Sequence, residues 1–221
     1  MAQTITEEAV KIPPAGLSGD LTIPAKAAGI VLFAHGSGSS RHSRRNRYVA
    51  SVLQEGRLAT LILDLLTETE EELDLQTRHL RFDIGLLAGR LREATDWLRH
   101  ESATRRLPVG YFGASTGGGA ALVAAAERPK VVGAVVSRGG RPDLAGPALR
   151  RVQAPTLLIV GGEDYEVIEL NRQAIAEMRC EKELSIVPGA THLFEEPGTL
   201  EQVSKLALSW FRRYLVGPRG S

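Results

Sequence analysis

Six short apolar runs, separated by segments with helical patterns, most constrain what this chain can fold into. They lie at residues 29–36, 58–66, 107–115, 130–140, 155–162 and 182–189. None shows the alternation of apolar and polar residues that marks a half-solvated strand. Such runs indicate strands that are buried on both faces of a parallel sheet. Strands alternating with helices over short gaps predict an α/β fold with a doubly wound, mostly parallel sheet.

The segments around these runs complete the expected architecture. Residues 79–100 and 198–215 carry apolar side chains at steps of three and four, which predicts two amphipathic helices. The N-terminal stretch "VKIPPAGLSGDLTIP" (10–24) favours an antiparallel hairpin at the sheet edge, because its prolines would interrupt a central strand. The acidic run at 67–74 is expected to be an exposed loop before the long helix.

Length and charge limit the classes of function. The chain has 221 residues, enough for a single domain with a buried core, which we expect over 1–216. The tail at 217–221, "GPRGS", resembles a cloning remnant. A net charge of +1 and the lack of a long apolar run favour neither nucleic acid nor a membrane as partner. The lone Cys180 and the polar start fit a cytoplasmic protein.

A serine set among glycines marks the candidate reaction centre. The segment "VGYFGASTGGGAALVAAAERP" (109–129) places Ser115 between the end of a predicted strand and the start of a predicted helix, with Gly113 and Gly117 on either side. This is the G-x-S-x-G pattern of a nucleophile elbow, in which a sharp turn holds the serine hydroxyl above the sheet. The small residues leave room for that turn, and the helix N-terminus points amides at the site.

The glycine-rich stretches allow three other interpretations. The serine could simply cap a helix after a glycine-rich turn. A phosphate-binding loop needs a lysine that "GASTGGGAA" lacks. A dinucleotide-binding loop at Gly36 and Gly38 would need a third glycine where Arg41 stands.

The partners of a catalytic serine are expected further along the chain, in the order acid and then histidine, each on a loop after a strand. Of the five histidines, only His192 follows Ser115. The acid is expected in "GGEDYEV", where we choose Asp164 and take Glu163 and Glu166 as solvated neighbours. The carboxylate would hold the imidazole in the correct tautomer.

The loop after the first central strand, "FAHGSGSSRHS", is expected to form part of an oxyanion hole. We predict that the backbone N–H groups of Ser37 and Thr116 donate to the charge that develops on the substrate oxygen. His35 is expected to brace this loop by hydrogen bonds rather than to act as a base.

With these loops placed, the chain resembles the dienelactone hydrolase family of the α/β-hydrolases from about residue 8 to 215. The resemblance is carried by "HGSGSSRHSRRNR", "GASTGGGAAL", "VVSRGGRPDL", "LLIVGGEDYEV" and "PGATHLFEEPG". It implies a cytoplasmic hydrolase of a small ester or lactone that needs no metal or other cofactor. Members of the family proper carry a cysteine nucleophile, whereas this chain has Ser115, so we expect a carboxylesterase. Cys180 is expected to serve packing.

Two arginine features are candidates for substrate binding. Arg41 begins a cluster that continues with Arg44, Arg45 and Arg47, and could attract an anionic substrate or form a solvated helix turn. Arg138 follows the next predicted strand, on the side of the sheet where ligands bind. It could pair with a carboxylate or phosphate of the substrate, or form a structural salt bridge.

Two other functions remain open. The first is a ligand-binding or sensor protein that has little turnover on a hydrolase fold. The second is an acyltransferase or perhydrolase, which would form the same acyl-enzyme but pass it to another acceptor. The sequence leaves a monomer or a homodimer equally open.

Overall fold

The computed structural model describes residues 5–216, and its strands form one eight-stranded sheet in the order β1-β2-β4-β3-β5-β6-β7-β8. Neighbours from β4 to β8 run parallel, whereas β1 and β2 run antiparallel. The strand bounds are β1 Ile5–Ile12, β2 Leu17–Pro24, β3 Ile30–Ala34, β4 Ala59–Leu63, β5 Val109–Ala114, β6 Val132–Arg138, β7 Thr156–Gly161 and β8 Lys182–Val187. This confirms the α/β fold with a mostly parallel sheet and an N-terminal edge hairpin.

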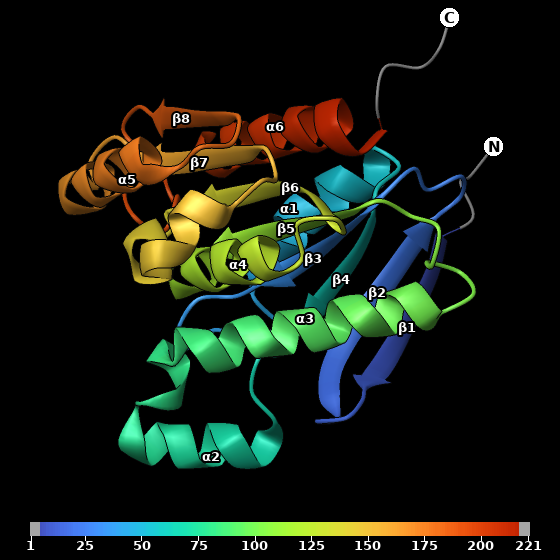
Figure 1. The fold of residues 1–221 in the computed structure, drawn as a ribbon. Coiled ribbons are helices and arrows are strands. Elements are labelled where there is room, and N and C mark those ends of the chain that lie inside the picture. Colours follow the sequence, from blue (N-terminus) through green and yellow to red (C-terminus); the bar gives the residue numbers. More distant parts are fainter. Residues whose placement is uncertain (1–4, 217–221) are drawn as a thin grey trace, which may run out of the picture.

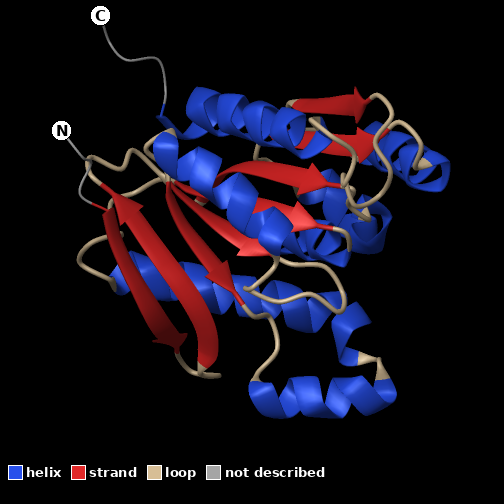
Figure 2. Cartoon of the chain, turned by 180° about the vertical axis from the view of Figure 1, so that it is seen from behind, coloured by secondary structure: helices blue, strands red, loops and turns tan. Residues whose placement is uncertain are grey.

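Helices cover both faces of the sheet (Figures 1 and 2). The α-helices are α1 Arg44–Glu55, α2 Glu68–Thr77, α3 Ile84–His100, α4 Thr116–Glu127, α5 Tyr165–Glu177 and α6 Thr199–Phe211. Helical segments of other types are the 3-10 segments η1 Leu80–Phe82 and η2 Pro142–Arg151, and the π-helical η3 Arg212–Val216. One face is covered by α1 and α6, and the other by α3, α4 and α5. Both faces of the parallel strands are therefore buried under helices, which agrees with their continuous apolar runs.

The core lies in two layers, one on each side of the sheet. On the α1 and α6 side, Phe33 of β3 and Phe112 of β5 are fully buried and pack with ring centroids 4.9 Å apart. On the other side, the buried Tyr111 makes a 2.6 Å hydrogen bond with Thr95 of α3. These packed layers hold the central strands, and all the parallel strands point their carboxyl ends at the same edge.

The acidic run at 67–74 forms helix α2, so the prediction of an exposed loop was wrong. Thr67 and Glu70 make a reciprocal capping box, in which each side chain accepts from the other residue's backbone N–H. Figure 1 shows α2 standing away from the sheet, beyond the end of α3.

The long helix predicted over 79–100 begins only at Ile84. The Asp83 side chain caps it by accepting from the N–H of Leu86 at 2.9 Å, and the preceding residues form the turn η1. The predicted tail at 217–221 lies outside the described residues.

Candidate active site

Ser115 occupies the turn between β5 and α4 in a strained conformation. Its φ is +51° and its ψ is −124°, a backbone region that residues other than glycine rarely adopt. Its N–H donates to the carbonyl of Arg138 at 3.3 Å, and its own carbonyl accepts from Arg141 at 3.0 Å. Two anchored peptide groups thus hold the serine at the carboxyl edge of the sheet.

The flanking glycines are required by close backbone packing. A Cβ on Gly113 would lie 2.5 Å from the carbonyl oxygen of Gly117, and one on Gly117 would lie 2.6 Å from the carbonyl oxygen of His35. Real Cβ atoms do not approach backbone so closely. The turn therefore excludes larger residues at both positions, as its G-x-S-x-G pattern indicates.

Asp164 and His192 lie together on the loops after β7 and β8. The Nδ1 of His192 is 2.6 Å from Oδ2 of Asp164. Asp164 sits where it could cap α5, but its side chain makes no capping bond. The carboxylate is therefore turned toward the imidazole, and an Nδ1–H donor leaves Nε2 free to accept a proton.

A cavity of about 240 Å³ contains both Ser115 and His192. Arg138 also lines it, together with Gly36 and Ser37 of the loop after β3. The sequence did not predict three polar residues that line the same cavity, Ser39, Ser43 and Asn46, of which Asn46 of α1 is 1% exposed. The sequence signal that could have indicated Asn46 is its position in the first turn of the helix, after the N-cap residue Ser43. The remaining lining residues are Arg45, Ala114 and Leu193.

The expected oxyanion donors lie next to each other, but one amide is already engaged. The N–H of Ser37 donates to the Oγ1 of Thr116 at 3.0 Å. Thr116 is the first residue of α4, where backbone N–H groups lack intrahelical partners. Gly36 lies against the nucleophile, since a Cβ there would be 2.9 Å from the Cβ of Ser115. The loop is thus close enough to the serine to contact a bound carbonyl.

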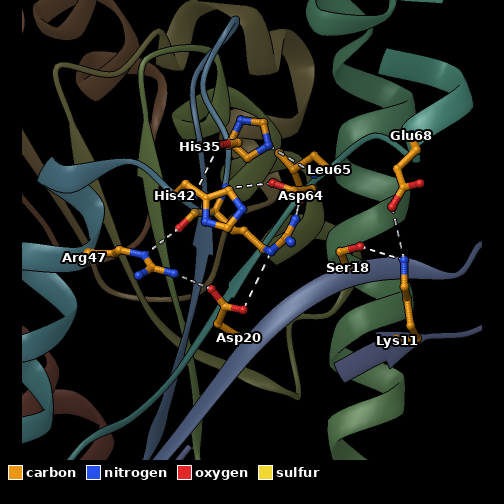
Figure 3. A network of polar contacts seen from close by, with 11 residues as sticks. Lys11, Ser18, Asp20, His35, His42, Arg47, Asp64, Leu65 and Glu68 are labelled. Carbon is orange, nitrogen blue, oxygen red and sulfur yellow. Dashed lines mark hydrogen bonds and ion pairs between the residues drawn. The ribbon is translucent and has the colours of Figure 1, made fainter. Parts of the chain in front are cut away.

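His35 braces the loop after β3 by hydrogen bonds, as predicted. Its Nε2 accepts from the N–H of Leu65 at 3.1 Å, and its Nδ1 lies 2.9 Å from the carbonyl oxygen of Gly36 (Figure 3). Burial lowers the pKa of His35, against smaller opposing effects from the Gly36 carbonyl and Asp64. The neutral form with the proton on Nδ1 satisfies both bonds, so this imidazole ties β3 to the segment after β4.

Three arginines of the 41–47 cluster are paired with carboxylates. The Arg41 guanidinium contacts Asp64 and lies 3.7 Å from Asp20. Asp20 also accepts from Arg47 at 2.7 Å (Figure 3). Arg45 pairs with Glu195 at 2.9 Å. Arg41 does not line the cavity that holds Ser115. These ion pairs give Arg41 a structural role, and we do not include it in the proposed site.

Cys180 packs against the core at half-burial, and burial raises the pKa of its thiol, with Thr156 and Lys182 opposing more weakly. That environment suits packing rather than nucleophilic attack. Within residues 5–216, no group of three or more His, Cys, Asp or Glu side chains is placed to hold a metal ion. Over the same residues, no helix is both long enough and apolar enough to cross a membrane.

α/β-Hydrolase folds place a serine on a strained turn between a strand and a helix. They place a histidine, bonded to a carboxylate, on a later loop, and the geometry described above has the same arrangement. Residues 19–215 match the dienelactone hydrolase family. The chain belongs to the dienelactone hydrolase family.

A solved structure agrees with this assignment. A dienelactone hydrolase from Anabaena variabilis is 64% identical, with a TM-score of 0.93, and the match covers 96% of this chain and 99% of that one. Est1E from Butyrivibrio proteoclasticus has a TM-score of 0.75 at 15% identity, over 92% of this chain and 97% of that one, and shares the fold alone.

Two curated relatives from Mycobacterium tuberculosis, strains CDC 1551 and H37Rv, are each 62% identical over 205 residues. Both carry the provisional name of phosphoribosyl transferase. The match covers 93% of this chain but 45% of each relative, so the chain spans less than half the length of these proteins.

Proposed function

We propose that this chain is a serine hydrolase that cleaves a small carboxylic ester or lactone through an acyl-enzyme on Ser115. The observation that carries the proposal is one cavity shared by Ser115 and His192, with His192 bonded to Asp164 at 2.6 Å. A serine hydroxyl is a weak nucleophile, and a carboxylate-oriented imidazole is the base that activates it. Family membership supports a hydrolase.

Acylation proceeds by attack of the Ser115 Oγ on the substrate carbonyl carbon. Nε2 of His192 takes the hydroxyl proton as the new C–O bond forms, and the carbonyl π electrons move to its oxygen. Collapse of this tetrahedral intermediate expels the alkoxide of the ester, which leaves with the proton held by His192. Asp164 stabilises the imidazolium between these two transfers.

The charged oxygen of the intermediate is stabilised by hydrogen-bond donors that already point at it before the reaction. The backbone N–H groups of Ser37 and Thr116 are proposed for this role. Because the Ser37 amide is bonded to the Thr116 hydroxyl, that hydroxyl must rotate away for the amide to reach the oxyanion. Such an exchange replaces one hydrogen bond by a stronger, charge-assisted one. Water activated by His192 then releases the acid and restores Ser115.

The provisional name of the Mycobacterium relatives concerns proteins more than twice the length of the matched part. The geometry around Ser115 favours hydrolysis for the part represented by this chain. We also propose a cytoplasmic location, consistent with a single half-buried cysteine, and one domain over 1–216, because the described strands form one sheet.

The test is hydrolysis of a panel of aryl esters and lactones by the wild type, Ser115→Ala and Ser115→Cys. We expect turnover with a pre-steady-state burst in the wild type, loss of the burst in Ser115→Ala, and a trapped thioester mass in Ser115→Cys. Adding methanol or hydrogen peroxide then separates hydrolysis from acyl transfer by the products formed. Tight ligand retention without turnover of any ester would contradict the proposal and favour a sensor.

A further inference from the structure

The turn that follows β6, residues 138–141, is bonded to the nucleophile from both of its ends. The carbonyl of Arg138 accepts from the N–H of Ser115 at 3.3 Å, and the N–H of Arg141 donates to the carbonyl of Ser115 at 3.0 Å. The Arg138 guanidinium meets no carboxylate within ion-pair distance among residues 5–216. Backbone hydrogen bonds therefore join this turn to Ser115, and a movement of the turn would also move the serine.

The same turn lies against the proposed base. The N–H of Gly139 donates to the carbonyl of Ile159 in β7 at 2.7 Å, which ties the turn to the next strand. A Cβ on Gly139 would lie 3.1 Å from the carbonyl oxygen of His192 and 3.6 Å from Cε1 of its ring. A single short turn therefore contacts both Ser115 and His192.

Asn171 of α5 bonds the middle of this turn. Its side chain is fully buried, and its Nδ2 donates to the carbonyl of Gly140 at 3.0 Å and to the carbonyl of Val167, one helical turn earlier, at 2.7 Å. Asn171 does not line the cavity that contains Ser115 and His192. It can therefore affect the reaction only through the residues that it holds.

The stability of the core does not require an amide at position 171. The Oδ1 of Asn171 is buried and accepts no hydrogen bond from any residue in 5–216. A buried polar atom without a partner costs free energy, and an apolar side chain of similar size would avoid that cost. Of the two bonds that Nδ2 makes, only the one to Gly140 joins α5 to another segment. The contact with the turn is thus what distinguishes the asparagine from an apolar residue.

We propose that Asn171 is a positioning residue, which fixes the turn at 138–141 through the carbonyl of Gly140 and thereby holds Ser115 and His192 in their relative placement. The inference rests on the proposed function, because it assigns a role in the reaction at Ser115. Proton transfer from the serine to the imidazole needs a close approach of two atoms, and a small displacement lowers the rate. Loss of the bond should therefore lower kcat and leave KM nearly unchanged.

The test is steady-state hydrolysis of 4-nitrophenyl acetate by the wild type and Asn171→Leu. Leucine has a similar size and removes the bond to Gly140 without placing a new polar atom in the core. We expect kcat to fall at least about 10-fold, with KM changed by less than about threefold. An unchanged kcat, or a fall in kcat/KM that comes from KM alone, would overturn the inference.

Asn171→Ser keeps the inference testable if the leucine variant does not fold. The serine hydroxyl can still donate to the carbonyl of Val167, four residues earlier in the helix, but it is too short to reach Gly140. We expect the same loss of kcat, which would assign the effect to the bond between Asn171 and Gly140. A folded serine variant with the kcat of the wild type would contradict the inference.

Thr104→Val is the matched control for the loss of a buried hydrogen bond. Thr104 is 2% exposed, and its Oγ1 donates to the carbonyl of Leu98 at 2.7 Å. It lies in the loop before β5, at the opposite end of the strand from Ser115. Urea unfolding should show a loss of stability in this variant, whereas its kcat should stay close to that of the wild type. An equal fall of kcat in Thr104→Val and Asn171→Leu would overturn the inference, because lost stability alone would explain both.

A readout without turnover separates this inference from the proposed function. In protein with isotope-labelled histidine, the Cε1–H resonance of His192 is assigned by its loss in His192→Gln. It should shift in Asn171→Leu, because Gly139 lies against that atom. The resonances of the exposed histidines, His42, His79 and His100, should not move.

An unmoved His192 resonance in folded Asn171→Leu would overturn the inference. If the resonance shifts but the wild type hydrolyses no ester, the placement of His192 by Asn171 is supported and it is the proposed function that fails.

Discussion

The Nδ1 of His192 lies 2.6 Å from Oδ2 of Asp164, which joins the loops after β7 and β8 at the carboxyl edge of the sheet. The Asp164 side chain is 15% exposed and that of His192 is 39% exposed. The carboxylate is thus shielded behind the imidazole, while the imidazole reaches the cavity. A carboxylate that orients a catalytic base requires this difference in exposure between the two side chains.

Substituting Asp164→Asn should lower kcat on a 4-nitrophenyl ester by about three to four orders of magnitude, because the amide favours the wrong imidazole tautomer. Steady-state kinetics measures the loss. Glu163→Gln is the matched control, since Glu163 bonds the exposed Tyr165 at 2.6 Å instead of His192. Equal losses in both variants would show that charge near the loop, rather than the bond to His192, matters.

Gly117→Ala should prevent folding or destabilise the protein by several kcal/mol, because its Cβ would be forced into backbone oxygens. Gly89→Ala provides the comparison within a helix that has room, where the nearest atom is a flexible Arg92 nitrogen at 3.5 Å. That variant should gain up to about 1 kcal/mol. Urea unfolding measures both. A Gly117→Ala protein as stable as the wild type would contradict the packing of the turn.

His35 should make stability fall in mild acid. Its folded-state pKa lies below the ordinary value of 6.5, so the unfolded chain takes up the proton first as the pH drops. The contribution of neutral His35 to the free energy of unfolding is complete above pH 6.5. Below that pH it declines by at most about 1.4 kcal/mol per pH unit. Urea unfolding at pH 8 and pH 5.5 should show a smaller decline in His35→Gln. An identical decline would exclude this role for His35.

Asp74 should anchor helix α2 to the body. It is 1% exposed and accepts from the backbone N–H groups of Leu80 and Arg81. Burial alone would raise its pKa, but hydrogen bonds and charge from Arg81, with the Leu80 amide, hold the pKa below its usual range. Asp74→Asn should cost about 2 kcal/mol and speed amide exchange over 68–82. The exposed Glu72→Gln should stay within about 0.5 kcal/mol. Unchanged exchange in Asp74→Asn would contradict the anchor.

Most of the fold could be predicted because the signals are local. The apolar runs mark the parallel strands, and Pro13 and Pro14 mark the hairpin turn between β1 and β2. The run at 67–74 is acidic and exposed, as in a solvated loop, although it forms a helix. The capping pair Thr67 and Glu70 was visible in the sequence, but α2 packs too little on the sheet to show a clear apolar stripe.

Parts of the candidate site depend on packing between distant segments, which one sequence does not reveal. The position of Ser115 follows from its glycines, whereas the bond between Ser37 and Thr116 joins residues 79 positions apart. The unpaired state of Arg138 likewise depends on which carboxylates the other arginines take, such as Glu195 with Arg45. Ion-pair partners chosen across loops carry no periodic signal.

The most direct test of the central claim is labelling with a fluorophosphonate, followed by intact mass and peptide mapping. This reagent reacts with a serine that is already activated by a base. The account predicts one adduct on the wild type, mapped to Ser115, with none on folded Ser115→Ala and much slower labelling of His192→Ala. No adduct on the folded wild type, or an adduct at another serine, would contradict it.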